Sequence, residues 1–139
     1  MNVRTDTISI STRGFTDIID ITADVSAAVQ RSELNSGAVT VFVSGSTAGV
    51  TTIEYEPGLL QDIPEMLDKI APMNTRYFHD ATWGDGNGFA HVRAALIGCS
   101  LTVPFNSGRL LLGTWQQIVL IDFDNRPRQR EIILQMMGE

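Results

Sequence analysis

Residues 38–55 read Ala-Val-Thr-Val-Phe-Val-Ser-Gly-Ser-Thr-Ala-Gly-Val-Thr-Thr-Ile-Glu-Tyr. Two runs rich in small and β-branched residues, 38–43 and 50–55, lie on either side of a loop of small residues. Because β-branched side chains pack well on a pleated surface, both runs predict strands, and the first is expected to be buried. A β-sheet is therefore the framework on which we interpret the rest of the chain.

Further strands are predicted on both sides of this stretch. Residues 5–12 are rich in Ile, Ser and Thr and alternate, and residues 15–21 follow the turn signal Thr12-Arg13-Gly14. The last third is expected to be all-β, with strands at 100–105, 109–112, 114–123 and 128–137. Residues 106–108 and 124–127 have turn compositions.

Two helices are predicted from end signals and apolar spacing. Thr22 is expected to cap a helix that begins near Ala23. Pro57 suits the first position of a second helix, in which apolar residues recur at helical spacing up to Ile70. Pro64 lies inside that pattern, where we expect it to kink the helix or to divide it into two.

The segment 71–88 has no clean period and is predicted to be a long loop. Residues 90–97 are predicted to form a short third helix, with Gly98 as its left-handed stop. The result is a single α+β domain over residues 1–139, with mostly antiparallel sheets and two or three helices.

Composition and charge argue against several kinds of protein. No apolar run approaches the roughly 20 residues of a membrane span, and the first residues lack the layout of a signal peptide. The expected location is therefore cytoplasmic, with no membrane partner. The net charge of −6 makes nucleic acid a poor partner. Cys99 is the single cysteine, and we expect it to be a small buried residue.

Arg126, Arg128 and Arg130 lie at alternating positions near the C-terminus. On a strand, this spacing puts all three side chains on one face. The favoured interpretation is an edge strand that uses charge to discourage aggregation, and the alternative is a local basic patch.

The loop 44–49 is the first candidate binding site. Its small residues let a ligand approach the backbone, and the amides and hydroxyls of Ser46 and Thr47 could bind an anion such as phosphate. No Gly-Lys-Ser/Thr follows, so the loop is not a P-loop. On local sequence alone, a tight turn between two strands is the favoured interpretation.

The segment 77–93 is the second candidate. It holds both histidines of the chain, His79 and His91, together with Asp85 and Asn87. Histidine suits acid–base work near neutral pH and metal binding. His79, Asp85 and His91 could form a three-ligand metal site, although their spacing is no recognised metal motif. The alternatives are a solvated His79 and a hydrogen-bonded His91 at a helix start.

The third candidate is the segment that contains Thr114, Trp115 and Gln116. A Trp beside polar residues at a strand start often forms an amphipathic wall of a pocket or interface. A core Trp whose ring nitrogen finds one backbone partner is equally consistent with the sequence.

Three motifs occur together: Gly-Asp-Gly-Asn-Gly-Phe-Ala-His-Val-Arg at 84–93, Leu-Thr-Val-Pro-Phe at 101–105 and Leu-Gly-Thr-Trp-Gln-Gln at 112–117. In combination they resemble the YjbQ-like family, and the resemblance covers nearly the whole chain. It implies an α+β fold with sheets packed around a threefold axis, hence a homotrimer. It also implies a polar pocket near the subunit boundaries.

Members of this family often carry the label secondary thiamine-phosphate synthase. The resemblance therefore implies a weak transferase activity that joins a pyrimidine diphosphate to thiazole phosphate. It also implies pocket residues at the matching positions Asp85, Asn87, His91, Thr114, Trp115 and Gln116. His79 matches a family histidine that follows an aromatic residue.

One departure from the family pattern concerns the first candidate loop. Many members have a histidine where this chain has Gly45. Many also have an acidic residue at the position of Trp83 and an aspartate at that of Gly86. A metal site here would have fewer ligands, whereas anion binding by Ser46, Thr47 and backbone amides survives the change.

Three functions follow as hypotheses. In the first, an enzyme acts on a small phosphorylated metabolite held by Ser46, Thr47 and Arg93. His91, oriented by Asp85, acts as general acid or base, and a divalent cation offsets the charge of a diphosphate. In the second, a hydrolase uses Mg²⁺ or Zn²⁺ held by the three metal ligands named above. In the third, a non-catalytic homotrimer binds a metabolite.

Overall fold

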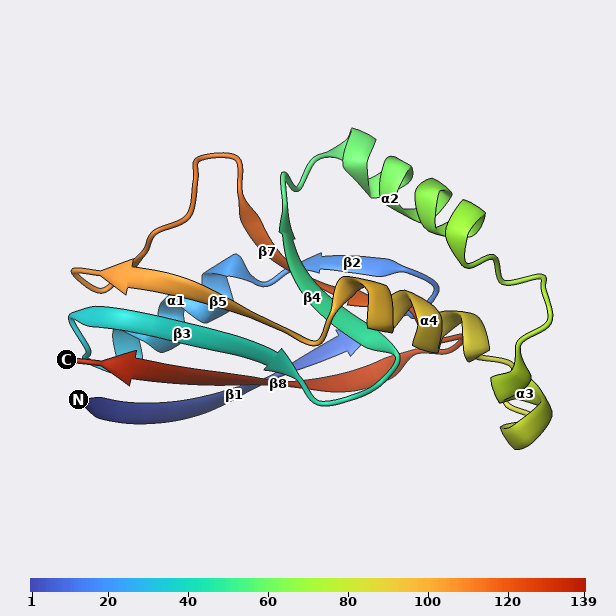
Figure 1. Ribbon diagram of the computed structural model, residues 1–139. Coiled ribbons are helices and arrows are strands. Elements are labelled where there is room, and N and C mark those ends of the chain that lie inside the picture. The colour runs from blue at the N-terminus through green and yellow to red at the C-terminus, as the bar shows by residue number, and fades with distance from the viewer.

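Eight strands form two antiparallel sheets (Figure 1). The structure is a computed structural model that describes residues 1–139. The five-stranded sheet contains, in spatial order, β1 (Asn2–Thr12), β8 (Arg128–Gly138), β3 (Ser36–Val43), β5 (Ser100–Asn106) and β6 (Arg109–Leu110). The three-stranded sheet contains β2 (Asp17–Asp20), β7 (Gln117–Asp122) and β4 (Ala48–Ile53).

Four helices complete the fold: α1 (Thr22–Arg31), α2 (Pro57–Ile70), α3 (Phe78–Trp83) and α4 (Gly88–Ile97). The α+β class is as predicted, but the prediction of two or three helices is too low. The additional helix, α3, lies within the segment predicted as a long loop. None of the helices is long and apolar enough to cross a membrane.

The ends of α1 and α4 differ from the predictions, and of the two alternatives for Pro64 the division into two helices is wrong. Thr22 is the first residue of α1 rather than its cap. Its hydroxyl donates to Asp20 at 2.6 Å and accepts the backbone N–H of Ile118 at 2.9 Å. α2 is one helix that contains Pro64. Gly98 ends α4 with a positive φ of 96°, but its ψ of 157° is not left-handed helical.

β7 lies between two hydrophobic cores. Ile118 and Leu120 belong to the larger core, which α1 and strands of both sheets form, whereas Val119 and Ile121 belong to a smaller core with α2 and α4. Alternate side chains of a strand point to opposite faces, so a strand covered on both faces reads as a continuous apolar run. The three-stranded sheet is therefore the middle layer of the domain.

Trp115 and Cys99 both lie at the surface, although a core position was one of two predictions for Trp115 and burial was predicted for Cys99. β7 begins only at Gln117, so Thr114 and Trp115 form a turn before the strand. Trp115 is 73% exposed, which excludes a core position. Cys99 is also exposed, because it lies in the short surface link between α4 and β5, and its predicted burial is wrong.

The arginine-rich strand β8 lies inside the five-stranded sheet. It pairs with β1 on one side and with β3 on the other. The prediction of an edge strand is therefore wrong. Arg128 and Arg130 belong to the beginning of this central strand, and Arg126 lies in the turn before it. The alternative prediction, a local basic patch, is left for these three arginines.

Connections between the two sheets meet at one corner of the molecule. The backbone N–H of Phe123, just after β7, donates to the carbonyl of Thr47, just before β4, at 2.9 Å. The N–H of Phe15, between β1 and β2, donates to the carbonyl of Asp124 at 2.7 Å. Loops that are far apart in sequence thereby lie side by side.

Candidate functional site

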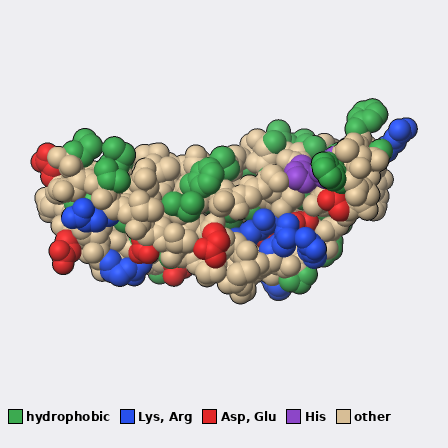
Figure 2. All heavy atoms as spheres, turned by 90° about the horizontal axis from the view of Figure 1, so that it is seen from below, with side chains coloured by type: hydrophobic (Ala, Val, Ile, Leu, Met, Phe, Trp, Pro, Cys, Tyr) green, Lys and Arg blue, Asp and Glu red, His purple; other side chains and the backbone are tan.

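A polar pocket of about 770 Å³ lies at this corner, and no hydrophobic residue lines it. Its walls are residues 44–47 of the β3–β4 loop, Asp85, Asn87 and His91 around the start of α4, and residues 125, 126 and 128–131. Figure 2 shows blue Lys and Arg side chains gathered beside a purple histidine on the face seen from below. A pocket of this size and lining suits a small, polar, charged ligand.

The structure brings together the residues of the first two candidate segments. Ser46 and Thr47 line the pocket from one loop, and Asp85, Asn87 and His91 line it from another. The loop 44–49 therefore does more than connect two strands, because it forms a wall of the pocket.

Arg128 and Arg130 also line this pocket, together with Arg126, which agrees with the alternative prediction of a local basic patch. Arg130 donates to Asp122 twice, at 2.7 and 2.9 Å, and Arg128 donates to Asp124 at 2.8 Å. The side chains of Asp122 and Asp124 are only 0% and 1% exposed. Charge-assisted hydrogen bonds that the two guanidinium groups donate to buried carboxylates fix both groups before any ligand binds.

Arg130 keeps a donor free for a ligand. Its Nε and Nη2 atoms bind Asp122 and Thr47, and Nη1 has no partner within the protein. Every fully buried side-chain nitrogen or oxygen has a partner, so Nη1 must reach the pocket space. A Cβ at Gly45 would lie 2.9 Å from this Nη1 atom. Arg130 thus occupies space that a side chain at position 45 would need.

Asp124 links the arginine side of the pocket to the histidine side. One of its oxygens accepts from Thr47 and Arg128, and the other accepts from the Asn87 amide. Burial alone would raise the pKa of Asp124. The hydrogen bonds that it accepts, first that from the backbone of Asn125, and the charge of Arg128 outweigh burial and hold the pKa below its usual 3.8. This carboxylate is therefore ionised at neutral pH.

Asn87 fixes the position of a proton on His79. Because ionised Asp124 can only accept, Asn87 must turn its amide NH₂ toward it, at 3.2 Å. The amide oxygen of Asn87 then faces Nε2 of His79 at 3.1 Å and can only accept. Nε2 therefore carries the proton of a neutral His79, and Nδ1 holds the lone pair.

His91 lies against His79, with ring centroids 4.1 Å apart and planes tilted by 45°. Burial, followed by the proximity of His79, lowers the pKa of His91 below its usual 6.5, and nearby carboxylates only partly oppose this shift. His91 is therefore mainly neutral at pH 7. A neutral imidazole on the pocket wall can accept a proton.

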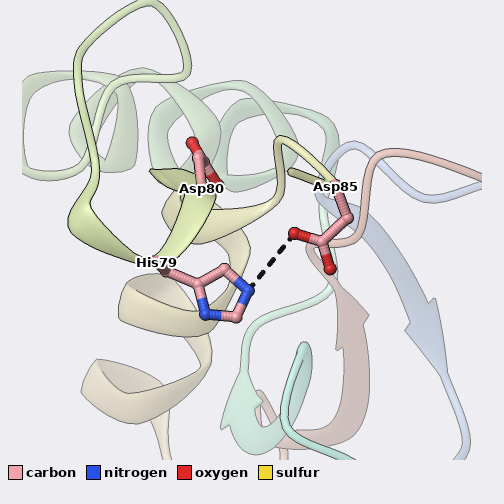
Figure 3. A group of neighbouring side chains, drawn as sticks. All are labelled: His79, Asp80 and Asp85. Atoms are coloured by element: carbon pink, nitrogen blue, oxygen red, sulfur yellow. Dashed lines mark ion pairs between the residues drawn. The ribbon is translucent and has the colours of Figure 1, made fainter. Parts of the chain in front are cut away.

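His79, Asp80 and Asp85 form a group whose possible ligand atoms lie within 4.8 Å of one another (Figure 3). Nε2 of His79 points toward Asp85, at 3.4 Å. This group contains Asp80 where the sequence-based prediction had His91. It fits a divalent cation only in part, because Asp80 already accepts the Gly88 N–H at 2.8 Å and Nε2 of His79 carries a proton.

Arg93 lies away from the pocket. Its guanidinium donates to the carbonyl of Ala71, the hydroxyl of Thr16 and the carboxylate of Asp68, at 2.9, 2.9 and 2.8 Å. The side chain is only 3% exposed. Arg93 therefore ties α4 to the end of α2, and the predicted role of Arg93 in holding phosphate is not supported.

Thr114, Trp115 and Gln116 also lie outside the polar pocket of a single chain. Thr114 and Trp115 border a separate hollow next to residues 54–56. The side chain of Gln116 donates to the hydroxyl of Thr52 at 3.1 Å. Their role in a binding site stays a prediction, one that needs a second copy of the chain.

Comparison with known proteins assigns the family. The family model described as UPF0047 protein YjbQ-like matches residues 6–139. A UPF0047 protein of Archaeoglobus fulgidus is 39% identical over 130 residues, which cover 94% of this chain and 98% of the relative. The UPF0047 protein YugU of Bacillus subtilis is 35% identical over 133 residues, covering 95% and 98%. The chain belongs to the YjbQ-like UPF0047 family.

Solved structures share the fold. A protein of Sulfolobus solfataricus P2, described as a YbjQ-like protein of unknown function, superposes with a TM-score of 0.94 at 32% identity and covers 99% of both chains. A hypothetical protein of Aeropyrum pernix K1 gives a TM-score of 0.91 at 31% identity, covering 98% and 99%. The predicted fold is confirmed.

Proposed function

We propose that the chain is an enzyme that acts on a small phosphorylated metabolite in the polar pocket. One observation carries this proposal: Arg128 and Arg130 are fixed by the buried carboxylates of Asp124 and Asp122 at the wall of a pocket without hydrophobic lining. Arg130 keeps Nη1 free and Arg128 binds Asp124 only through Nε, so both planar guanidinium groups can still donate to phosphate oxygens.

Ser46 and Thr47 have different roles in this proposal. Ser46 is exposed on the pocket wall, where its hydroxyl and the loop amides add donors for a phosphate. The hydroxyl of Thr47 donates to Asp124 at 3.0 Å and accepts from Arg130 at 2.6 Å. Thr47 therefore positions the arginine rather than the ligand.

His91 is the proposed general base or acid. It is mainly neutral at pH 7 and lies on the same pocket wall as Asp85 and Asn87. Asp85 forms its ion-pair contact with His79, at 3.4 Å, so its charge acts on His91 from a distance and raises the pKa of that ring. Asn87 positions His79 through the hydrogen bond described above.

The resemblance to proteins labelled secondary thiamine-phosphate synthase gives the first substrates to test, a pyrimidine diphosphate and thiazole phosphate. Mg²⁺ would offset the charge of the displaced pyrophosphate. We expect His91→Ala to lower kcat about 100-fold or more, since a positioned acid or base contributes that much. Turnover like that of the wild type in His91→Ala would remove His91 from the mechanism. No turnover by the wild-type protein would exclude this substrate pair.

A metal-dependent hydrolase is the second candidate, on the strength of the His79, Asp80 and Asp85 group. Elemental analysis of protein purified without chelator tests it. About one Zn²⁺ per chain, reduced in Asp85→Asn, would support a metal centre of three protein ligands. Protein that is free of metal, yet stabilised by pyrophosphate, would contradict it.

The homotrimer is likewise a proposal, supported by the resemblance and by the exposed Trp115. Light scattering should give a mass of about 46 kDa, three times the 15.2 kDa of one chain. A mass near that of one chain would contradict it. A trimer that is stabilised by phosphorylated compounds but never forms a product would support a non-catalytic, metabolite-binding role.

A further inference from the structure

A second hollow adjoins the polar pocket, and its walls differ in chemistry. It has a volume of about 320 Å³ and shares Gly45, Ser46 and His91 with the polar pocket. The rest of its wall is alanine, glycine and cysteine, with Ala95 and Cys99 exposed at its rim. No charged residue lines it. His91 therefore lies where a charged pocket meets an uncharged one.

The floor of this hollow is closely packed. Ala48 and Ala94 are only 1% and 6% exposed. β4 and the end of α4 are so close that a Cβ at Gly49 would lie 2.8 Å from the carbonyl oxygen of Gly98. The hollow exists because these residues are small, and larger side chains at its rim would fill it.

We propose that this hollow binds the apolar part of the ligand whose phosphate occupies the polar pocket. The inference rests on the proposed function and narrows its substrate class to phosphate esters of a small, uncharged, ring-sized group. A dry cavity of about 150 Å³ can hold a benzene ring, so the volume here is sufficient for one substituted ring. His91, shared by both hollows, then lies beside the bonds that join the ring to its phosphate.

Cys99 provides a direct test, because it is the single thiol of the chain and lies at the rim of the hollow. The rate at which Ellman's reagent modifies it is measured in wild-type protein with phenyl phosphate or with inorganic phosphate. At about ten times its Kd, phenyl phosphate leaves about a tenth of the sites free and should slow modification about tenfold. Inorganic phosphate at the same occupancy should leave the rate unchanged.

A pair of exposed alanines provides the matched variants. Ala95→Leu, in α4, fills the hollow and should weaken the binding of phenyl phosphate about tenfold, as measured by calorimetry. The reason is that a difference of one methylene group in a pocket already changes ligand affinity about tenfold. Its affinity for inorganic phosphate should not change. Ala23→Leu, on an exposed position of α1, should change neither affinity.

The outcomes separate this inference from the proposed function. If both compounds bind wild-type protein but neither protects Cys99, the apolar hollow is not part of the site and only the phosphate pocket stands. If neither compound binds, both proposals are wrong. Should Ala95→Leu fail to fold, the protection of Cys99 in wild-type protein still decides between these results.

Discussion

The side chain of Asp124 is only 1% exposed, and it accepts hydrogen bonds from Thr47, Asn87 and Arg128. At the scale of single residues, its charge holds the pocket together. Asp124→Asn would leave Arg128 without a buried counter-charge, so we expect it to lower the free energy of unfolding by about 3 kcal/mol. Urea unfolding at pH 7 measures this change.

The same variant has a pH signature and a matched control. The lowered pKa of Asp124 contributes stability that is present above pH 3.8 and lost as the pH falls through the folded value, so the difference from wild type should shrink below pH 3.8. Asp6 also binds an arginine, Arg31, at 2.6 Å, but the two side chains are 34% and 58% exposed. Asp6→Asn should therefore change stability by about 1 kcal/mol or less. Equal effects of the two variants would contradict the account.

His91 can be followed by NMR, because the chain has only two histidines. Its ring signals should titrate below pH 6.5, since burial and the neighbouring His79 both disfavour the charged ring. In His79→Gln the midpoint should rise, because one repulsive charge is removed. A wild-type midpoint at or above 6.5 would show that His91 is solvated.

At the scale of elements, the β1–β2 turn must pass close to the β7–β8 turn. Gly14 has a φ of 76°, and a Cβ there would lie 2.5 and 2.6 Å from the backbone oxygens of Arg126 and Asp124. Because backbone atoms cannot move aside cheaply, Gly14→Ala should lower the free energy of unfolding by about 2 kcal/mol or more.

A glycine with similar backbone geometry but open surroundings is the control for this substitution. Gly108 has a φ of 67°, and no atom lies within 4 Å of the position that a Cβ would occupy there. Gly108→Ala should therefore show only the cost of the backbone conformation, about 1 kcal/mol. Thermal unfolding of both variants compares them. A larger loss for Gly108→Ala than for Gly14→Ala would contradict the close approach of the two turns.

The strands could be predicted from the sequence much better than α3. The run 38–43 lies within β3, and the run 50–55 largely overlaps β4. Both were predictable because β-branched residues on a covered sheet leave a local sequence pattern. α3 buries none of its six residues, so it has no apolar stripe to detect. A tertiary bond, from the Gly88 N–H to Asp80, helps to hold this helix and cannot be read from spacing.

The residues of the candidate site, like the elements of the fold, were predictable only in part from the sequence. The segments around Ser46 and His91 were predictable as candidates, since a run of small polar residues and a pair of histidines close in sequence are local signals. The role of Arg128 and Arg130 was not, because alternating arginines look the same on an edge strand and on a central one. Asp122, at the end of an apolar run, was the signal that a buried ion pair forms there.

At the scale of the whole molecule, an acidic chain gathers three arginines at one pocket, whose wall also holds Asp85 and Glu131. The net charge is −6, yet Arg126, Arg128 and Arg130 all line the pocket. The topology explains this arrangement, because connections between the two sheets meet at one corner and bring distant loops together. Guanidinium donors that remain free in this pocket can bind a small anion, whereas the net negative charge of the chain disfavours polyanions.

A crystal structure of the protein grown with pyrophosphate would show whether the pocket binds phosphate groups. We predict pyrophosphate oxygens within hydrogen-bonding distance, about 3 Å, of the guanidinium groups of Arg128 and Arg130 and of the Ser46 hydroxyl. His91 should lie next to the bound ion. A pocket that holds only water at saturating pyrophosphate, or an ion bound elsewhere on the chain, would contradict the account.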